Sequence, residues 1–169
     1  MAIRFSYSFF YYNFYLIGKT NFEVIQLLGI IYAIVSGISM SLQGVFNTKL
    51  GEKIGTWETN VLVQLIGLIL TVIITAFAGK GNFKELNNAN KLYLLGGVLG
   101  VVIIFTVMMS IGSLGTTYAI GVILISQIIA AAIIDYFGLF GTEKLNFTLK
   151  DFLGVAIMII GIIVFKWKR

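Results

Sequence analysis

The groups best able to do chemistry in this sequence are an amide and an acid within an apolar segment. Gln127 and Asp135 lie eight residues apart in ISQIIAAAIIDYFGLFG, residues 125–141. A helix places them on one broad face about 12 Å apart along its axis, because each step of four residues adds only about 40°. Inside a membrane such groups are costly without a partner, so we consider Gln127 as a substrate contact and Asp135 as a gate or coupling carboxylate.

Two further segments carry polar residues at helical spacing. Tyr32, Ser36, Ser39, Gln43 and Asn47 recur at steps of three and four, and so do Asn60, Gln64, Gly67, Thr71 and Thr75. Each set occupies one face of a helix. These faces either hold helices together by hydrogen bonds or line a polar path. Packing is favoured for Ser and Thr, whereas both interpretations stay open for glutamine, which costs more to desolvate. The predicted substrate-path residues are Ser36, Ser39, Gln43, Asn47, Asn60, Gln64 and Gln127.

Several kinds of catalysis have no residues to support them. The chain has no Cys and no His, which removes the thiol nucleophile and the commonest general base and metal ligand. Asp135, Glu143 and Asp151 can meet at one interface, but their spacing matches no metal-binding loop. We therefore expect no catalytic residue, no metal and no cofactor, and an enzyme is the least favoured class of function.

The composition indicates a membrane protein. Of the 169 residues, 59% are hydrophobic and 11% charged, whereas a soluble domain has about 25% charged residues. A soluble fold of this size lacks the polar cover for so many apolar side chains. The net charge of +5 is spread between apolar blocks and the chain ends. That distribution favours the flanks of membrane spans over a nucleic-acid surface.

The uncharged segments predict an all-α integral membrane protein, a bundle of five transmembrane helices. About 20 apolar residues span a bilayer. The run of 43 uncharged residues from 92 to 134 is long enough for two spans, with a break at GSLG, residues 112–115. The fifth span is shorter in its uncharged part, and a surface helix is its alternative. The predicted spans are about 24–48, 59–79, 92–112, 115–135 and 149–167.

Position along the fourth span separates the acid from the amide. If that helix begins near Thr116, Asp135 is its twentieth residue and lies at the membrane boundary, while Gln127 lies near the middle. The amide is thus the stronger candidate for substrate contact. Close helix packing is expected at small residues, namely Gly96, Gly100, Gly121, Gly154 and Gly161.

The first 23 residues differ from the single transmembrane domain expected over residues 24–169. They are rich in Phe and Tyr and lack the shape of a secretory signal. An interfacial anchor and a wrongly chosen start codon are both consistent with them.

Two segments, residues 42–51 and residues 125–141, together resemble the signatures of the YdcZ-like family of the drug/metabolite transporter superfamily. LQGVFNTKLG, residues 42–51, resembles its first-helix signature, and ISQIIAAAIIDYFGLFG resembles its fourth, with Ser126 replacing the usual glycine. SLGT at residues 113–116 is similar to the family's entry to that helix. The likeness covers roughly residues 27–166. The residues that match are Gln43, Asn47, Leu50, Gly51, Gln127, Asp135, Gly138, Leu139, Leu153, Gly154 and Gly161.

The resemblance implies a small bacterial inner-membrane protein of five helices. Its superfamily moves small metabolites or cationic drugs, mainly outward and often with proton coupling. Related small multidrug-resistance proteins use a Glu in the middle of the first helix, and no acid lies in the first span here. We therefore do not expect this chain to use the proton or cation mechanism of the small multidrug-resistance proteins.

Basic residues do not select one orientation in the membrane. With five spans, seven Lys and Arg lie on one side and five on the other, or five on each side without the first 23 residues. Many transporters consist of two inverted halves. We therefore expect a small-molecule transporter subunit, an exporter acting as an antiparallel dimer with itself or a paralogue. The alternative is a non-transporting accessory or assembly protein of the membrane.

Overall fold

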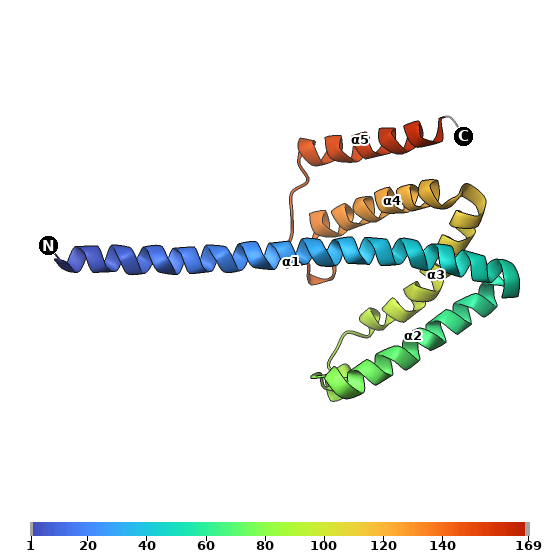
Figure 1. Ribbon diagram of the computed structural model, residues 1–169, viewed down its shortest axis with the longest axis horizontal. Helices are drawn as coiled ribbons and strands as arrows, with labels where there is room; N and C mark the ends of the chain where they lie inside the picture. Colours follow the sequence, from blue (N-terminus) through green and yellow to red (C-terminus); the bar gives the residue numbers. More distant parts are fainter. Residues whose placement is uncertain (1, 168–169) are drawn as a thin grey trace. The chain divides into compact units, whose positions relative to one another are not determined.

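The computed structural model describes the backbone of residues 2–167 and the side chains of residues 24–167. The aromatic extension of residues 1–23, with its two hypotheses, lies outside the residues whose side chains are described. Between residues 2 and 167 there is no strand. This part forms five α-helices (Figure 1): α1 (Ala2–Ile54), α2 (Thr56–Ala78), α3 (Leu95–Leu114), α4 (Thr116–Phe137) and α5 (Leu149–Lys166). Short 3₁₀ helices lie at Phe83–Asn87, Lys91–Leu94 and Leu139–Gly141.

Four segments are long and apolar enough to cross a membrane: Val24–Ile54, Thr56–Ala78, Lys91–Leu114 and Thr116–Phe137. The fifth helix, α5, has 18 residues, a length of about 27 Å at the α-helical rise. It carries Lys150 and Asp151 in its first turn and Lys166 at its end, so its apolar part is shorter than in the other four. The prediction of an all-α membrane protein with five helices is confirmed.

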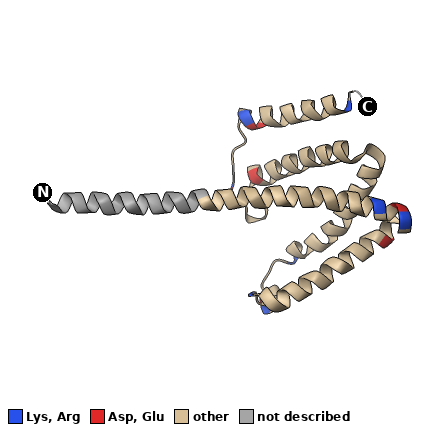
Figure 2. Ribbon diagram, in the orientation of Figure 1, with Lys and Arg blue, Asp and Glu red and all other residues tan. Residues whose placement is uncertain are grey.

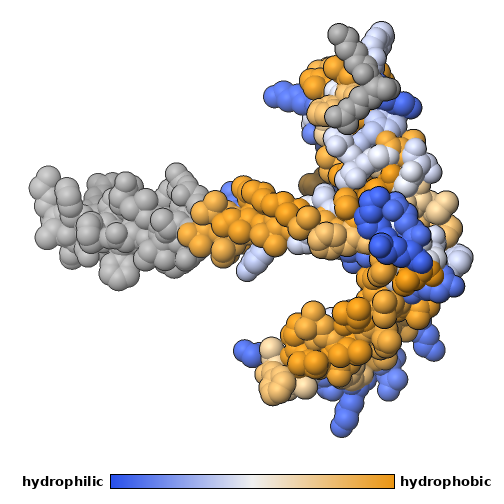
Figure 3. All heavy atoms as spheres, turned by 45° about the vertical axis from the view of Figure 1, so that its right-hand side comes forward, coloured by the Kyte–Doolittle hydropathy of each residue, from blue (hydrophilic) through white to orange (hydrophobic). Residues whose placement is uncertain are grey.

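The helix surfaces are those of a protein that a bilayer surrounds. Among the described residues, only Met108, Ile111 and Ala119 are buried hydrophobic side chains. Charged residues gather at the turn between α1 and α2 and at the ends of α5 (Figure 2). Most of the exposed surface of α2, and of α1 from residue 24 on, is hydrophobic (Figure 3). Soluble monomers rarely expose apolar surface on this scale, whereas a protein surrounded by lipid does so.

The chain divides into two compact units, Met1–Leu42 and Gln43–Arg169. In the first unit, residues 24–40 of α1 are exposed along their whole length, Ser36 and Ser39 included. The Ser41 hydroxyl donates a hydrogen bond to the carbonyl oxygen of Gly37 in the same helix, at 3.0 Å. The second unit contains the last turns of α1 and the other four helices, and all the contacts discussed below lie within it.

The turn between α1 and α2 is tighter than the sequence suggested. The charges from Lys49 to Glu58 predicted a loop, yet α1 continues to Ile54. Lys49 and Glu52 pair on the helix surface with 2.9 Å between Nζ and Oε1, a spacing that a helix favours. The chain turns only at Gly55, whose φ of 99° and ψ of 152° belong to a region that essentially only glycine occupies.

A glycine of the same conformation separates α3 from α4. Gly115, with φ 78° and ψ 156°, is the one residue between these helices, within the expected break at 112–115. Gly138, with φ 63° and ψ 39°, ends α4 in the left-handed conformation typical of a helix C-terminus. A capping box of Thr148 and Asp151 begins α5.

Successive helices pack side by side in the second unit, α2 on α3, α3 on α4 and α4 on α5. Three glycines mark close approaches, and one of them is Gly51 of α1, where a Cβ would lie 2.5 Å from Met108 Cε of α3. A Cβ on Gly121 of α4 would lie 2.5 Å from Ile162 Cδ1 of α5, and a Cβ on Gly44 of α1 would lie 2.8 Å from Ile111 Cδ1 of α3. The other glycines predicted to pack closely have more space around them. A Cβ on Gly100 would lie 3.5 Å from Gln64 Nε2. A Cβ on Gly96, Gly154 or Gly161 would have no atom of another helix within 4 Å.

Candidate functional site

The structure separates the predicted substrate-path residues by burial. Asn47 of α1 is 6% exposed and Asn60 of α2 is 2% exposed. Gln64, one turn after Asn60, is half-buried. The other four, Ser36, Ser39, Gln43 and Gln127, are exposed. Two asparagines and one glutamine therefore lie between helices of this chain, and four candidates face its surroundings.

Asn60 and Gln64 meet α3 where that helix allows close approach. Asn60 Nδ2 donates to the carbonyl oxygen of Val101 at 2.9 Å. The Gln64 amide lies against Gly100, since a Cβ there would be 3.5 Å from Nε2. The absence of a side chain at residue 100 thus leaves room for the glutamine beside the α3 backbone. Asn60, unlike a threonine that bonds its own helix, forms an interhelical hydrogen bond.

An aromatic pair stands beside these two amides. Trp57 of α2 and Phe105 of α3 stack with ring centroids 4.6 Å apart and an interplanar angle of 17°. Trp57 lies on the same face of α2 as Asn60 and Gln64, because residues three and seven positions apart share a helix face. That spacing is visible in the sequence and could have added Trp57 to the candidates.

These residues line an open cavity of about 380 Å³ where α2 meets α3, here called the α2–α3 cavity, and most of its lining side chains are exposed. Its lining is Trp57, Asn60, Val61, Gln64, Leu65, Leu68 and Val101. The polar side-chain groups there are two amides and one indole N–H, and none of the lining residues is charged. An apolar wall with a few hydrogen-bonding groups is the usual design of a small-molecule site.

A second set of buried polar residues lies where α1 ends and α2 begins. Thr48 Oγ1 donates to Gly44 O at 2.7 Å and is satisfied within its own helix. Thr59 is fully buried, and its hydroxyl has no hydrogen-bond partner among the described residues. Thr48 and Thr59 were not among the predicted site residues, because their positions carry no signal beyond that of an ordinary helix hydroxyl.

The amide and the acid of α4 lie apart from the α2–α3 cavity. Gln127 is exposed on α4, and Asp135 is half-buried in its last turns. The backbone oxygen of Asp135 accepts hydrogen bonds from the N–H groups of Gly138 and Leu145, at 3.3 and 3.0 Å. The α4 helix runs from Thr116 to Phe137, so Asp135 is near its end, as counting from Thr116 predicted.

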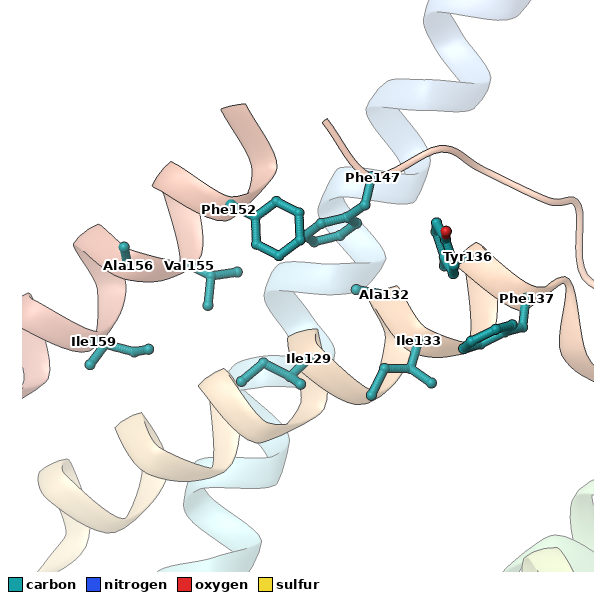
Figure 4. Close-up of a pocket in the computed structure, with 10 residues that line it drawn as sticks. All are labelled: Ile129, Ala132, Ile133, Tyr136, Phe137, Phe147, Phe152, Val155, Ala156 and Ile159. Carbon is teal, nitrogen blue, oxygen red and sulfur yellow. The ribbon is translucent and has the colours of Figure 1, made fainter. Parts of the chain in front are cut away.

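A larger and almost wholly apolar cavity of about 720 Å³ lies between α4 and α5. Figure 4 shows its aromatic end, where Phe147 and Phe152 stand edge to face with centroids 5.0 Å apart. Its one polar side-chain group is the Tyr136 hydroxyl. The lining is Ile129, Ala132, Ile133, Tyr136, Phe137, Phe147, Phe152, Val155, Ala156 and Ile159. Such a wall takes up apolar groups but offers little to orient them.

The chain has several helices long enough to cross a membrane, and the amides of Asn60 and Gln64 lie against α3. These features define a multi-pass integral membrane protein. A family model described as "Putative inner membrane exporter, YdcZ" matches residues 28–164. Because this match covers well over half of the chain, the chain belongs to the YdcZ family. The resemblance found in the sequence is thereby confirmed, as is the location in the inner membrane. Searches of the curated proteins and of the solved structures gave no match.

Proposed function

We propose that this chain is the subunit of an exporter that carries a small molecule across the inner membrane, with the α2–α3 cavity as part of the substrate path. The description of the family as a "putative inner membrane exporter" supports transport as the general role. The observation that carries the proposal is a pair of amides, Asn60 and Gln64, lining a cavity between two membrane helices. Polar groups that line cavities within membrane domains mark substrate paths in transporters.

The working unit is an antiparallel dimer of this chain with itself or a paralogue. Gln43 and Gln127 are exposed on helices whose other exposed residues are mostly hydrophobic. An amide that faces hydrocarbon lacks hydrogen-bond partners, whereas a neighbouring helix supplies them. A second chain therefore explains why these two amides point outward. The balanced count of basic residues is consistent with insertion in both orientations.

Asp135 acts in this proposal as a gate at one mouth of the path. It stands near the C-terminal end of α4, where a carboxylate is close to water rather than in the centre of the bilayer.

Flux into proteoliposomes tests the transport function. Purified protein is reconstituted and screened with a panel of radiolabelled small metabolites that includes neutral, cationic and anionic members. We expect uptake of at least one compound, abolished by Gln127→Leu while folding and membrane insertion are retained. The matched control is Thr71→Val, since the Thr71 hydroxyl bonds only carbonyls of its own helix. Normal flux in Gln127→Leu would remove that residue from the path.

The same screen separates the self-paired transporter from an accessory membrane protein, which moves nothing by itself. Orientation is tested independently by fusing compartment-sensitive reporters to the C-terminus. Activity of both a cytoplasmic and a periplasmic reporter is expected for the self-paired dimer. A single orientation would require a paralogue of opposite orientation, and the lack of one would refute the antiparallel assembly.

A further inference from the structure

We propose that the α2–α3 cavity binds an uncharged, compact, planar molecule that both donates and accepts hydrogen bonds, such as a carboxamide or lactam on an aromatic ring. This inference rests on the proposed function and names the substrate class of the same site. Three features of the cavity carry it: the absence of charge, the hydrogen-bonding state of its two amides and the aromatic side chain at its end.

The lining excludes a permanent ion. None of its residues is charged, and an ion within a membrane domain needs an opposite charge or a set of hydrogen bonds to replace its water. The nearest acid in sequence is Glu58, but its carboxylate folds back against Gly55 at the start of α2. The cavity therefore accepts neutral molecules in preference to cations or anions.

The two amides specify complementary hydrogen bonds. Asn60 Nδ2 donates a hydrogen bond to the carbonyl oxygen of Val101, while Asn60 Oδ1 accepts no hydrogen bond from the described part of the chain. Asn60 thus requires a donor on the ligand. Gln64 forms no hydrogen bond with the described residues and offers both an acceptor and a donor. The two residues are one turn apart, about 6 Å along the helix, which suits a ligand with a donor and an acceptor in proximity.

The aromatic end and the size favour a small flat molecule. One face of Trp57 is covered by Phe105, yet the residue is 58% exposed and lines the cavity. A planar ring can stack on the part of the indole that remains open. The volume of about 380 Å³ accommodates one ring with its substituents.

Trp57 provides a direct probe of binding. The chain has two tryptophans, and Trp167→Phe leaves the indole of the cavity as the only one. The full chain carrying this change is placed in lipid nanodiscs and titrated with three molecules of one ring system: nicotinamide, which is neutral, 1-methylnicotinamide, which is a cation, and nicotinate, which is an anion. Benzamide and uracil serve as further neutral probes.

We expect a saturable change of Trp57 fluorescence with at least one neutral probe, and at least tenfold weaker binding of both ions. Gln64→Leu should weaken the neutral probe about tenfold, while Thr71→Val leaves it unchanged. Gln64→Glu should shift the preference toward 1-methylnicotinamide. Circular dichroism confirms that each variant is folded, and Gln64→Leu alone suffices if the acidic variant does not insert.

Lack of a saturable signal with all three neutral probes would overturn the inference, as would equal binding of the cation. Because the fluorescence titration measures binding independently of flux, failure of the neutral site can be distinguished from failure of the exporter. Flux of any compound by a protein that shows no saturable Trp57 signal with the three neutral probes would keep the exporter and refute the neutral site. Saturable binding of nicotinamide without flux of any compound would keep the site and refute the exporter.

Discussion

The hydrogen bond between Asn60 and Val101 gives the sharpest test of how α2 and α3 are held together. Asn60→Leu keeps the approximate volume and removes the bond from Nδ2 to the Val101 oxygen, 2.9 Å long in the structure. Val101 lies inside α3, so its carbonyl keeps the bond of its own helix and is not left unpaired. The expected loss is therefore the value of one interhelical bond in a membrane, about 0.6 kcal/mol and at most about 1.7 kcal/mol.

Asn60→Asp should cost more at neutral pH, because its carboxylate would face the Val101 carbonyl oxygen without a proton to donate. The expected loss is about 2.5–3.5 kcal/mol, the insertion cost of an acid within a span.

Reversible unfolding by SDS in mixed micelles measures both variants, followed by the fluorescence of Trp57 in the Trp167→Phe background. Thr71→Val is the control, since its hydroxyl bonds Gly67 O at 2.9 Å within one helix, and it should stay within about 0.5 kcal/mol. A loss in Asn60→Leu well above about 1.7 kcal/mol, or an equal loss in both variants at neutral pH, would refute the account.

Three further outcomes concern glycines, each measured by the same unfolding assay. Gly115→Ala should destabilise by about 1–3 kcal/mol through its backbone conformation alone, because a Cβ there meets nothing within 4 Å; no loss would contradict the required φ of 78°. Gly154→Ala, inside α5 and equally unobstructed, should stabilise by about 0.5–1 kcal/mol, and destabilisation would show a contact at that position. Gly121→Ala should cost about 1–3 kcal/mol by overpacking against Ile162, and Ile162→Ala in the same chain should recover part of this loss; additive losses would refute the contact.

The membrane class and the helices were predictable because their signals are local. Apolar length decides whether a segment can span a bilayer, and it is counted along the chain without knowing any neighbour. The break between α3 and α4 was predictable for the same reason, since Gly115 adopts a conformation that other residues avoid. The extension of α1 to Ile54 differs from the predicted end of the first span near residue 48, because charged residues such as Lys49 and Glu52 also pair well on a helix surface.

The sequence by itself determined that amides recur on one face of several membrane helices, since periodicity depends only on the helical repeat. It could not say which of them are enclosed. Only the tertiary structure decided that Asn47 and Asn60 are buried while Gln43 and Gln127 face outward. Burial depends on where a second helix crosses the first. For Asn60 and Gln64 that crossing is set by the packing of α2 on α3 at Gly100 and Val101, residues whose role no spacing within α2 can reveal.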